Sequence, residues 1–179
     1  MDPKPISRVA LALSCLIGPP SLATAQTAAR PSDVATPEAI VGAMYEIVTR
    51  RPGEPFDWDR LRTLCLPDAM LIPNTEQTGG VSQVFSVEDF TRWADGLMPI
   101  GGPDDKGLQE EEIARRIERY GDIAQVFSTY QTRFWNDPVI LARGINSIQL
   151  VHRDARWWVV SVIWDEENGA GPLPERYRP

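Results

Sequence analysis

The sequence contains few of the residues that form zinc sites or disulfides. Its 179 residues include only two cysteines, Cys15 and Cys65, and one histidine, His152. A zinc site of the His/Cys type takes about four such ligands, so a single chain cannot assemble one here. Cys65 lies between two leucines, which is typical of a small buried residue, and we expect His152 to flank a turn. No phosphate-binding loop or nucleophile–base pair is visible, so we predict neither a metal nor a cofactor.

Long apolar runs are also absent beyond the first residues. Lys4 and Arg8 precede an apolar run over residues 9–18, and Ala23-Thr24-Ala25 is a small-residue site suited to signal peptidase. The run is shorter than the roughly 20 residues that a membrane-spanning helix needs. We therefore expect residues 1–25 to be a signal peptide and the mature protein to be exported, either periplasmic or secreted.

A lipoprotein signal is the alternative interpretation of this segment. It would use Cys15 as the modified residue, but Ala12 stands where such signals usually carry leucine. The soluble, cleaved form is therefore the prediction. No later stretch is long enough to span a membrane, so we expect no membrane insertion after cleavage.

Positive charge is in deficit. The chain has 18 lysines and arginines against 25 acidic residues, a net charge of −7. Without residues 1–25, which hold two basic residues and one acidic residue, the balance is 16 to 24, a net charge of −8. An acidic surface repels phosphate backbones and anionic lipids, so we predict no nucleic-acid partner.

Three helices are predicted in the first half of the mature chain. Thr36-Pro37 is typical of a helix start, with threonine as the N-cap and proline in the first turn. A second, short helix begins at Asp57 and ends before Pro67. A third begins at Ser86, where Asp89 three positions later forms a capping-box pattern.

The second half predicts antiparallel strands joined by turns. Alternating, β-branched and aromatic residues mark four strands, over 110–119, 126–134, 139–152 and 156–164. The first of these also has Glu/Arg pairs four apart that would suit a helix, but the turn signal Tyr120-Gly121-Asp122 favours a strand. We interpret the run Glu110-Glu111-Glu112 as a solvent-exposed strand entry.

This order of elements predicts one α+β domain, with three N-terminal helices packed on a curved, mixed or antiparallel sheet. The domain is expected over residues 36–167. A flexible lead over 26–35 precedes it, and a Gly/Pro-rich tail over 168–179 follows it.

Both faces of the last predicted strand are apolar. A sheet with one face in water alternates apolar and polar side chains, whereas residues 156–164 do not. The helices can cover one face, and a second subunit or a packed loop is the natural cover for the other. We therefore predict a homodimer.

The order and spacing of four segments resemble the nuclear-transport-factor-2-like (NTF2-like) superfamily, in particular its SnoaL-like and ketosteroid-isomerase-like branches. The resemblance spans residues 37–167 and implies a cone whose open end leads into an apolar pocket. That fold hosts isomerases, dehydratases, cyclases, epoxide hydrolases and binding modules, so it does not specify a function. The segments are Ala43-Met44-Tyr45-Glu46-Ile47-Val48, Leu66-Pro67-Asp68-Ala69, Tyr120-Gly121-Asp122-Ile123-Ala124 and 156–164.

The resemblance implies three catalytic positions, of which two are vacant. Isomerases of this group use a tyrosine that donates a hydrogen bond, a carboxylate base, and a protonated acid on a late strand. Tyr45 lies where the tyrosine would be, although it could equally be a core or groove residue. Pro73 falls at the position of the base and Ser147 at that of the acid. Asn74, next to the proline, could hydrogen-bond a ligand or be a plain turn residue.

The register of the last two strands predicts which side chains face the pocket. If Asp154-Ala155 is a two-residue turn, His152 pairs with Trp157 and pairing then proceeds one for one. This register places Ser147, Gln149 and Trp164 on one face, which Thr129 and Gln131 of the neighbouring strand are expected to share. The resemblance to the isomerases implies that this face lines the pocket. The same register turns the side chains of Asn146, Ile148 and Trp157 to the opposite face of the sheet.

The predicted ligand-binding residues are therefore Tyr45, Asn74, Gln131, Ser147, Gln149 and Trp164. No catalytic residue is assigned. The vacant acid and base favour a binding module that holds a small, largely apolar molecule without chemistry, because proton transfer needs a group that titrates near the working pH. The alternative is a lyase, isomerase or cyclase that uses Tyr45 with a polar partner from this set.

Overall fold

The computed structural model describes residues 28–97 and 103–179. The predicted signal peptide over 1–25 lies outside the described residues and stays a prediction. Within the described part of the chain, no helix is long and apolar enough to cross a membrane.

The three predicted helices are present and begin at the predicted caps. They are α2 (Pro37–Val48), α3 (Trp58–Leu64) and α4 (Val87–Leu97). The Thr36 hydroxyl and the Asp57 carboxylate each accept a hydrogen bond from the backbone N–H three residues later, at 3.1 Å. Ser86 accepts from the Asp89 N–H in the same way. These caps satisfy donors that the first helical turn leaves unpaired.

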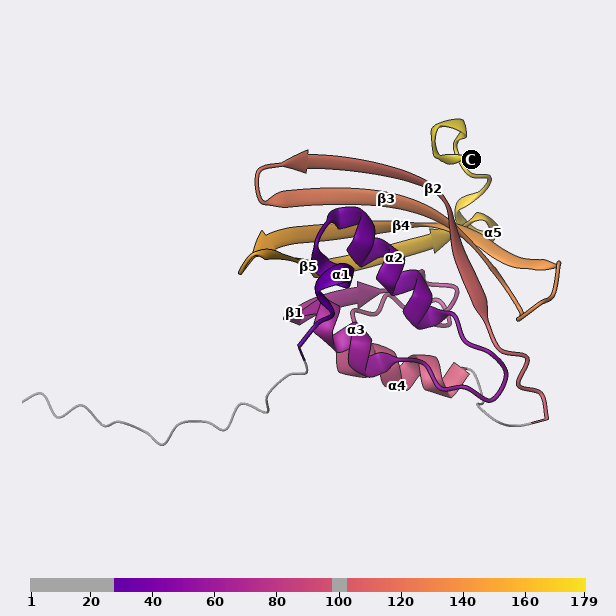
Figure 1. Cartoon of the computed structure of the whole chain (residues 1–179). Helices are drawn as coiled ribbons and strands as arrows, with labels where there is room; N and C mark the ends of the chain where they lie inside the picture. Colours follow the sequence, from indigo (N-terminus) through magenta and orange to yellow (C-terminus); the bar gives the residue numbers. More distant parts are fainter. Residues whose placement is uncertain (1–27, 98–102) are drawn as a thin grey trace, which may run out of the picture.

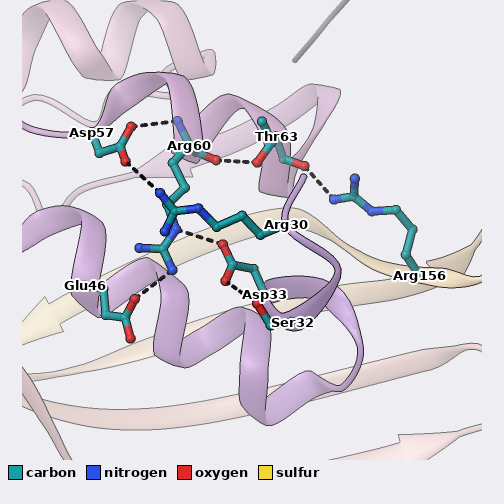
Figure 2. Close-up of polar contacts among 8 residues, drawn as sticks. All are labelled: Arg30, Ser32, Asp33, Glu46, Asp57, Arg60, Thr63 and Arg156. Atoms are coloured by element: carbon teal, nitrogen blue, oxygen red, sulfur yellow. Dashed lines mark hydrogen bonds and ion pairs between the residues drawn. The ribbon is translucent and has the colours of Figure 1, made fainter. Parts of the chain in front are cut away.

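A further short helix, α1 (Pro31–Val34), forms where a flexible lead was predicted. Val34 is buried in the core, and the Asp33 carboxylate accepts a hydrogen bond from Arg60 Nε at 2.7 Å. Arg60 also donates to Glu46 at 2.7 Å, so a single guanidinium on α3 links α1 and α2 (Figure 2). The hydrogen bond from Arg60 holds the pKa of Asp33 below its usual value. The buried pairing is what orders this segment, and sequence composition does not reveal it.

The sheet has five strands in the order β1-β5-β4-β3-β2. Strand β1 runs parallel to β5 and the other neighbours are antiparallel, which makes the sheet mixed. Its first strand begins directly after α3. The strands are β1 (Cys65–Ile72), β2 (Gln109–Tyr120), β3 (Ile123–Arg133), β4 (Ile140–Arg153) and β5 (Arg156–Glu166).

The pairing of β4 with β5 changes register once. Next to the turn, His152 pairs with Trp157, as predicted. Further along, Gln149 pairs with Ser161 where one-for-one pairing would give Val160. One extra residue in β5 therefore forms a β-bulge, and every side chain beyond it changes face relative to β4.

A second bulge lies in β2, between Glu112 and Ala114. Residues three apart in a regular strand point to opposite faces. The bulge instead brings Glu112 and Arg115 to the same face, where they form a bidentate ion pair. This pair takes part in the site described below.

Figure 1 shows α1 to α4 on one side of the sheet and the C-terminal segment away from them. That segment, α5 (Glu167–Ala170) and the 3-10 turn η1 (Glu175–Tyr177), follows β5. The Tyr177 ring stacks on Phe127 at 5.2 Å, and the Tyr177 carbonyl accepts a hydrogen bond from Thr129. The tail thus covers part of the sheet face opposite the helices. Met70 and Ile163, on neighbouring strands of that face, remain 44% and 47% exposed.

Candidate functional site

A cavity of about 480 Å³ lies between the helices and the sheet. Its walls are mainly aromatic and aliphatic, and a few polar groups enter it from α2, the loop after β1, and strands β2 to β5. The apolar lining includes Met44, Val48, Phe56, Trp58, Leu61, Leu71, Phe90, Trp93, Phe134, Ile148, Val162 and Trp164. The polar lining is Tyr45, Gln77, Glu110, Tyr130, Thr132, Asn146 and Glu166. Apolar walls with a few placed polar groups are what a small-molecule site requires.

Of the six predicted ligand-binding residues, the structure brings Tyr45 and Trp164 to the cavity. Gln131 instead donates to Glu111 on the face away from the helices. Asn74 is a turn residue, and its side-chain oxygen accepts the Gln77 N–H at 2.9 Å.

The predicted facing of Ser147 and Gln149 is wrong. Both lie on the face opposite the cavity, and Gln149 is exposed there. Asn146 and Ile148, predicted to point away, line the cavity with Trp164. The bulge in β5 exchanges the two sets, because it shifts the pairing by one residue. Trp157 lies before the bulge, on the helix-covered face, and is buried in the core.

Tyr45 belongs to a hydrogen-bond chain that runs away from the cavity. Its hydroxyl lies 2.6 Å from the Ser128 hydroxyl and accepts a hydrogen bond from Asn146 Nδ2 at 3.0 Å. Ser128 donates to the Glu112 carboxylate, which Arg115 holds from the other side. Burial and nearby carboxylates raise the pKa of Tyr45, so its hydroxyl stays protonated.

A second cluster contains two carboxylates. Tyr130 donates to Glu166 at 3.2 Å, and Thr132 donates to Glu110 at 3.0 Å. Burial, together with the negative charge of Glu166, raises the pKa of Glu110 to about 7. Burial also raises the pKa of Glu166. The interpretation of the 110–112 run as solvent-exposed is therefore wrong for Glu110, which faces an apolar cavity.

The alternation of side chains along a strand was the sequence signal that could have identified Glu110 as a cavity residue. Successive strand residues point to opposite faces, so a run of three acids on a strand sends either its middle member or its two outer members inward. Here Glu111 faces outward and pairs with Arg133 at 3.1 Å. Glu110 and Glu112 face inward because their β3 partners, Thr132 and Tyr130, do so.

Solved structures provide the comparison. An NTF2-like protein of unknown function from Pseudomonas putida KT2440 superposes with a TM-score of 0.54 at 12% identity, over 72% of this chain and 82% of that one. The chain has the NTF2-like fold. A protein from Parabacteroides distasonis ATCC 8503, assigned provisionally as a ketosteroid isomerase, gives a TM-score of 0.51 at 11% identity, over 79% and 95% of the two chains. No family model matches the sequence, and a comparison with curated proteins finds no relative.

At this identity the likeness concerns the fold alone, so the chemistry of this NTF2-like chain has to come from its own residues. Within residues 28–97 and 103–179, no group of three or more His, Cys, Asp or Glu side chains is placed to hold a metal. Cys65 is buried, and burial raises the pKa of its thiol to about 12.

Proposed function

We propose that this NTF2-like domain binds a small, largely apolar molecule in the cavity between helices and sheet. The observation that carries the proposal is the cavity itself, about 480 Å³ with six aromatic side chains in its apolar lining. Burial of an apolar ligand against such walls supplies affinity, and the few polar groups orient it.

A second candidate is a proton-transfer enzyme of the lyase or isomerase type. Glu110 favours it, because a pKa of about 7 suits a group that gives and takes protons near neutral pH. The hydrogen bonds of Tyr45 argue against this enzymatic function. The Tyr45 hydroxyl is engaged by Ser128 and Asn146, whereas an isomerase of this kind needs that hydroxyl to donate to the substrate. Binding is therefore the function that the geometry supports best.

One calorimetric experiment tests the cavity. We expect the mature protein to bind 1-naphthalenemethanol, and Trp164→Ala to weaken that binding by about 2 kcal/mol, because the ligand loses an aromatic wall. Trp158→Ala, on the other face of the same strand, should leave the affinity unchanged. Equal affinities in all three proteins would show that the ligand binds elsewhere.

A proton-exchange measurement on the wild-type protein distinguishes ligand binding from proton-transfer catalysis. In D2O, the methyl protons of 2-acetylnaphthalene should exchange no faster with the protein than without it. Exchange that depends on Glu110 would establish the proton-transfer function instead.

We also propose a homodimer that pairs through the sheet face opposite the helices. Met70 and Ile163 support it, because they leave apolar side chains half-exposed on that face beside the part that the C-terminal tail covers. Sedimentation velocity at micromolar concentration should show a dimer, and Ile163→Glu should shift it to a monomer. A wild-type protein that sediments as a monomer would contradict the proposal.

A further inference from the structure

The hydrogen-bond chain at Tyr45 has only one consistent direction. A glutamate in a bidentate pair with an arginine offers acceptors alone, so the contact with Glu112 takes the single hydroxyl proton of Ser128. Tyr45 must then donate its own proton to Ser128 across their 2.6 Å contact. Toward the cavity, Tyr45 presents oxygen lone pairs, one of which accepts from Asn146. Tyr45 is an acceptor for a ligand and not a donor.

The other polar groups of the cavity are oriented in the same sense. Tyr130 and Gln77 Nε2 both donate to Glu166. Thr132 donates to Glu110, and the indole N–H of Trp164 donates to Gln77 Oε1 at 2.8 Å. The hydroxyl protons of the cavity and the indole proton of Trp164 are thus used inside the protein. The lone pairs and carboxylate oxygens that remain can accept hydrogen bonds from a ligand.

The charges of the cavity are also of one sign. Glu110 and Glu166 line it, whereas no lysine, arginine or histidine is among its lining residues in the described part of the chain. Residues 98–102, which the structure does not describe, contain no basic residue.

Two cations lie behind the aromatic walls. Arg50 contacts the ring of Phe56 and is paired with Asp105 at 2.8 Å, and the exposed Lys106 contacts the ring of Phe134. Neither lines the cavity. A positive charge inside it therefore has to come from the ligand.

We propose that the ligand is an apolar primary amine, whose ammonium group is bound by Glu110 and Glu166 while its apolar body packs against the aromatic walls. This inference rests on the proposed function and narrows it to one class of molecule. An ammonium group has three donors and no acceptor, which matches a cavity of acceptors. The rings of Trp164, Phe90 and their neighbours add attraction for a cation that comes within reach of their faces.

The proposal predicts a pH dependence of affinity. The titratable groups that face Glu110 are Glu166 on β5, Tyr130 on β3 and Tyr45 on α2, and both tyrosines stay neutral because burial raises the pKa of each. Since the pKa of Glu110 is about 7, its carboxyl group is neutral below this pH and negative above it. Affinity for an alkylammonium ion, which keeps its charge over this range, should therefore rise with pH through about 7.

Three probes with the same naphthalene ring and different polar groups test the inference by calorimetry at pH 8. We expect 1-naphthylmethylamine to bind about tenfold or more tightly than 1-naphthalenemethanol, and 1-naphthoic acid to bind most weakly, because hydrogen bonds between opposite charges are the strong ones. Glu110→Gln keeps the shape of the side chain and should remove most of the amine preference while the alcohol still binds. Glu111→Gln, its neighbour on the other face, should retain the preference.

The outcomes separate the two proposals. If the alcohol binds but the amine binds no more tightly, the cavity function stands and the amine inference is overturned. If none of the three probes binds, both fail. The wild-type pH series needs no variant, and an amine affinity that is flat or falls between pH 6 and pH 8 also overturns the inference. Circular dichroism shows whether Glu110→Gln is folded, so that its affinities can be compared with those of the wild type.

Discussion

Replacing Trp157 by alanine should lower the free energy of unfolding by about 4 kcal/mol, because it removes a large aromatic side chain from the core. Trp157 is 2% exposed and lies on the helix-covered face of β5. The Arg119 guanidinium lies over its ring at 4.8 Å, and the His152 ring lies 5.2 Å away. Urea denaturation followed by circular dichroism measures the change.

The adjacent tryptophan is the matched control. Trp158 is on the opposite face, partly exposed, with the Arg156 guanidinium 3.6 Å from its ring centre. Trp158→Ala should cost about 1 kcal/mol, the size of a partly exposed cation–π contact. Similar losses at the two positions would contradict the assignment of faces along β5.

Gly144→Ala should lower the free energy of unfolding by about 3 kcal/mol, because the added methyl group has no space. A Cβ atom at this position would lie 2.3 Å from the Asp165 carbonyl oxygen and 2.7 Å from the Tyr130 hydroxyl. Tyr130 pairs with Gly144 across the strands and crosses it to reach Glu166. The substitution must therefore separate the backbones of β4 and β5 or displace the Tyr130 ring, and ligand binding should weaken with stability.

Gly42→Ala provides the control for this substitution. Gly42 lies within α2, where an added Cβ would meet nothing within 4 Å. Alanine is the better helix former by about 0.8–1 kcal/mol, so this variant should be slightly more stable than the wild type. Unchanged thermal unfolding of Gly144→Ala beside a stabilised Gly42→Ala would show that β4 and β5 can adjust at no cost.

The sequence predicted the helix starts and the hairpin turn well, because each depends on interactions between residues that are close in the chain. Thr36 and Ser86 cap their helices as predicted, and the second helix begins at Asp57 as predicted, because a cap involves only the next three residues. The turn at Asp154-Ala155 also sets the pairing of His152 with Trp157. Both turn residues have positive φ, which fits a two-residue hairpin turn.

The site was predicted less well, because its residues depend on long-range pairing. The bulge at Val160 lies inside a run, residues 157–164, that is apolar on both faces except for Ser161, and its alternation does not distinguish a bulged strand from a regular one. A shift of one residue was enough to replace Ser147 and Gln149 by Asn146 and Ile148 at the cavity. Glu110 was missed for a related reason. Its charge suggests solvent, and only the packing of helices over β2 and β3 places it against apolar walls.

The sequence by itself determined the α+β class, the caps and turns, the run of strands after residue 107, and the presence of Tyr45 and Trp164 near a pocket. The class, the caps, the turns and the strands follow from side-chain periodicity and from hydrogen bonds between residues close in the chain, whereas the pocket was implied by the resemblance to the NTF2-like superfamily. Tertiary structure alone decided which face each strand residue takes beyond a bulge, the direction of the hydrogen bonds from Tyr45, and the raised pKa of Glu110. Those properties depend on neighbours that are distant in sequence, because burial and donor–acceptor pairing arise only when the strands and helices are assembled.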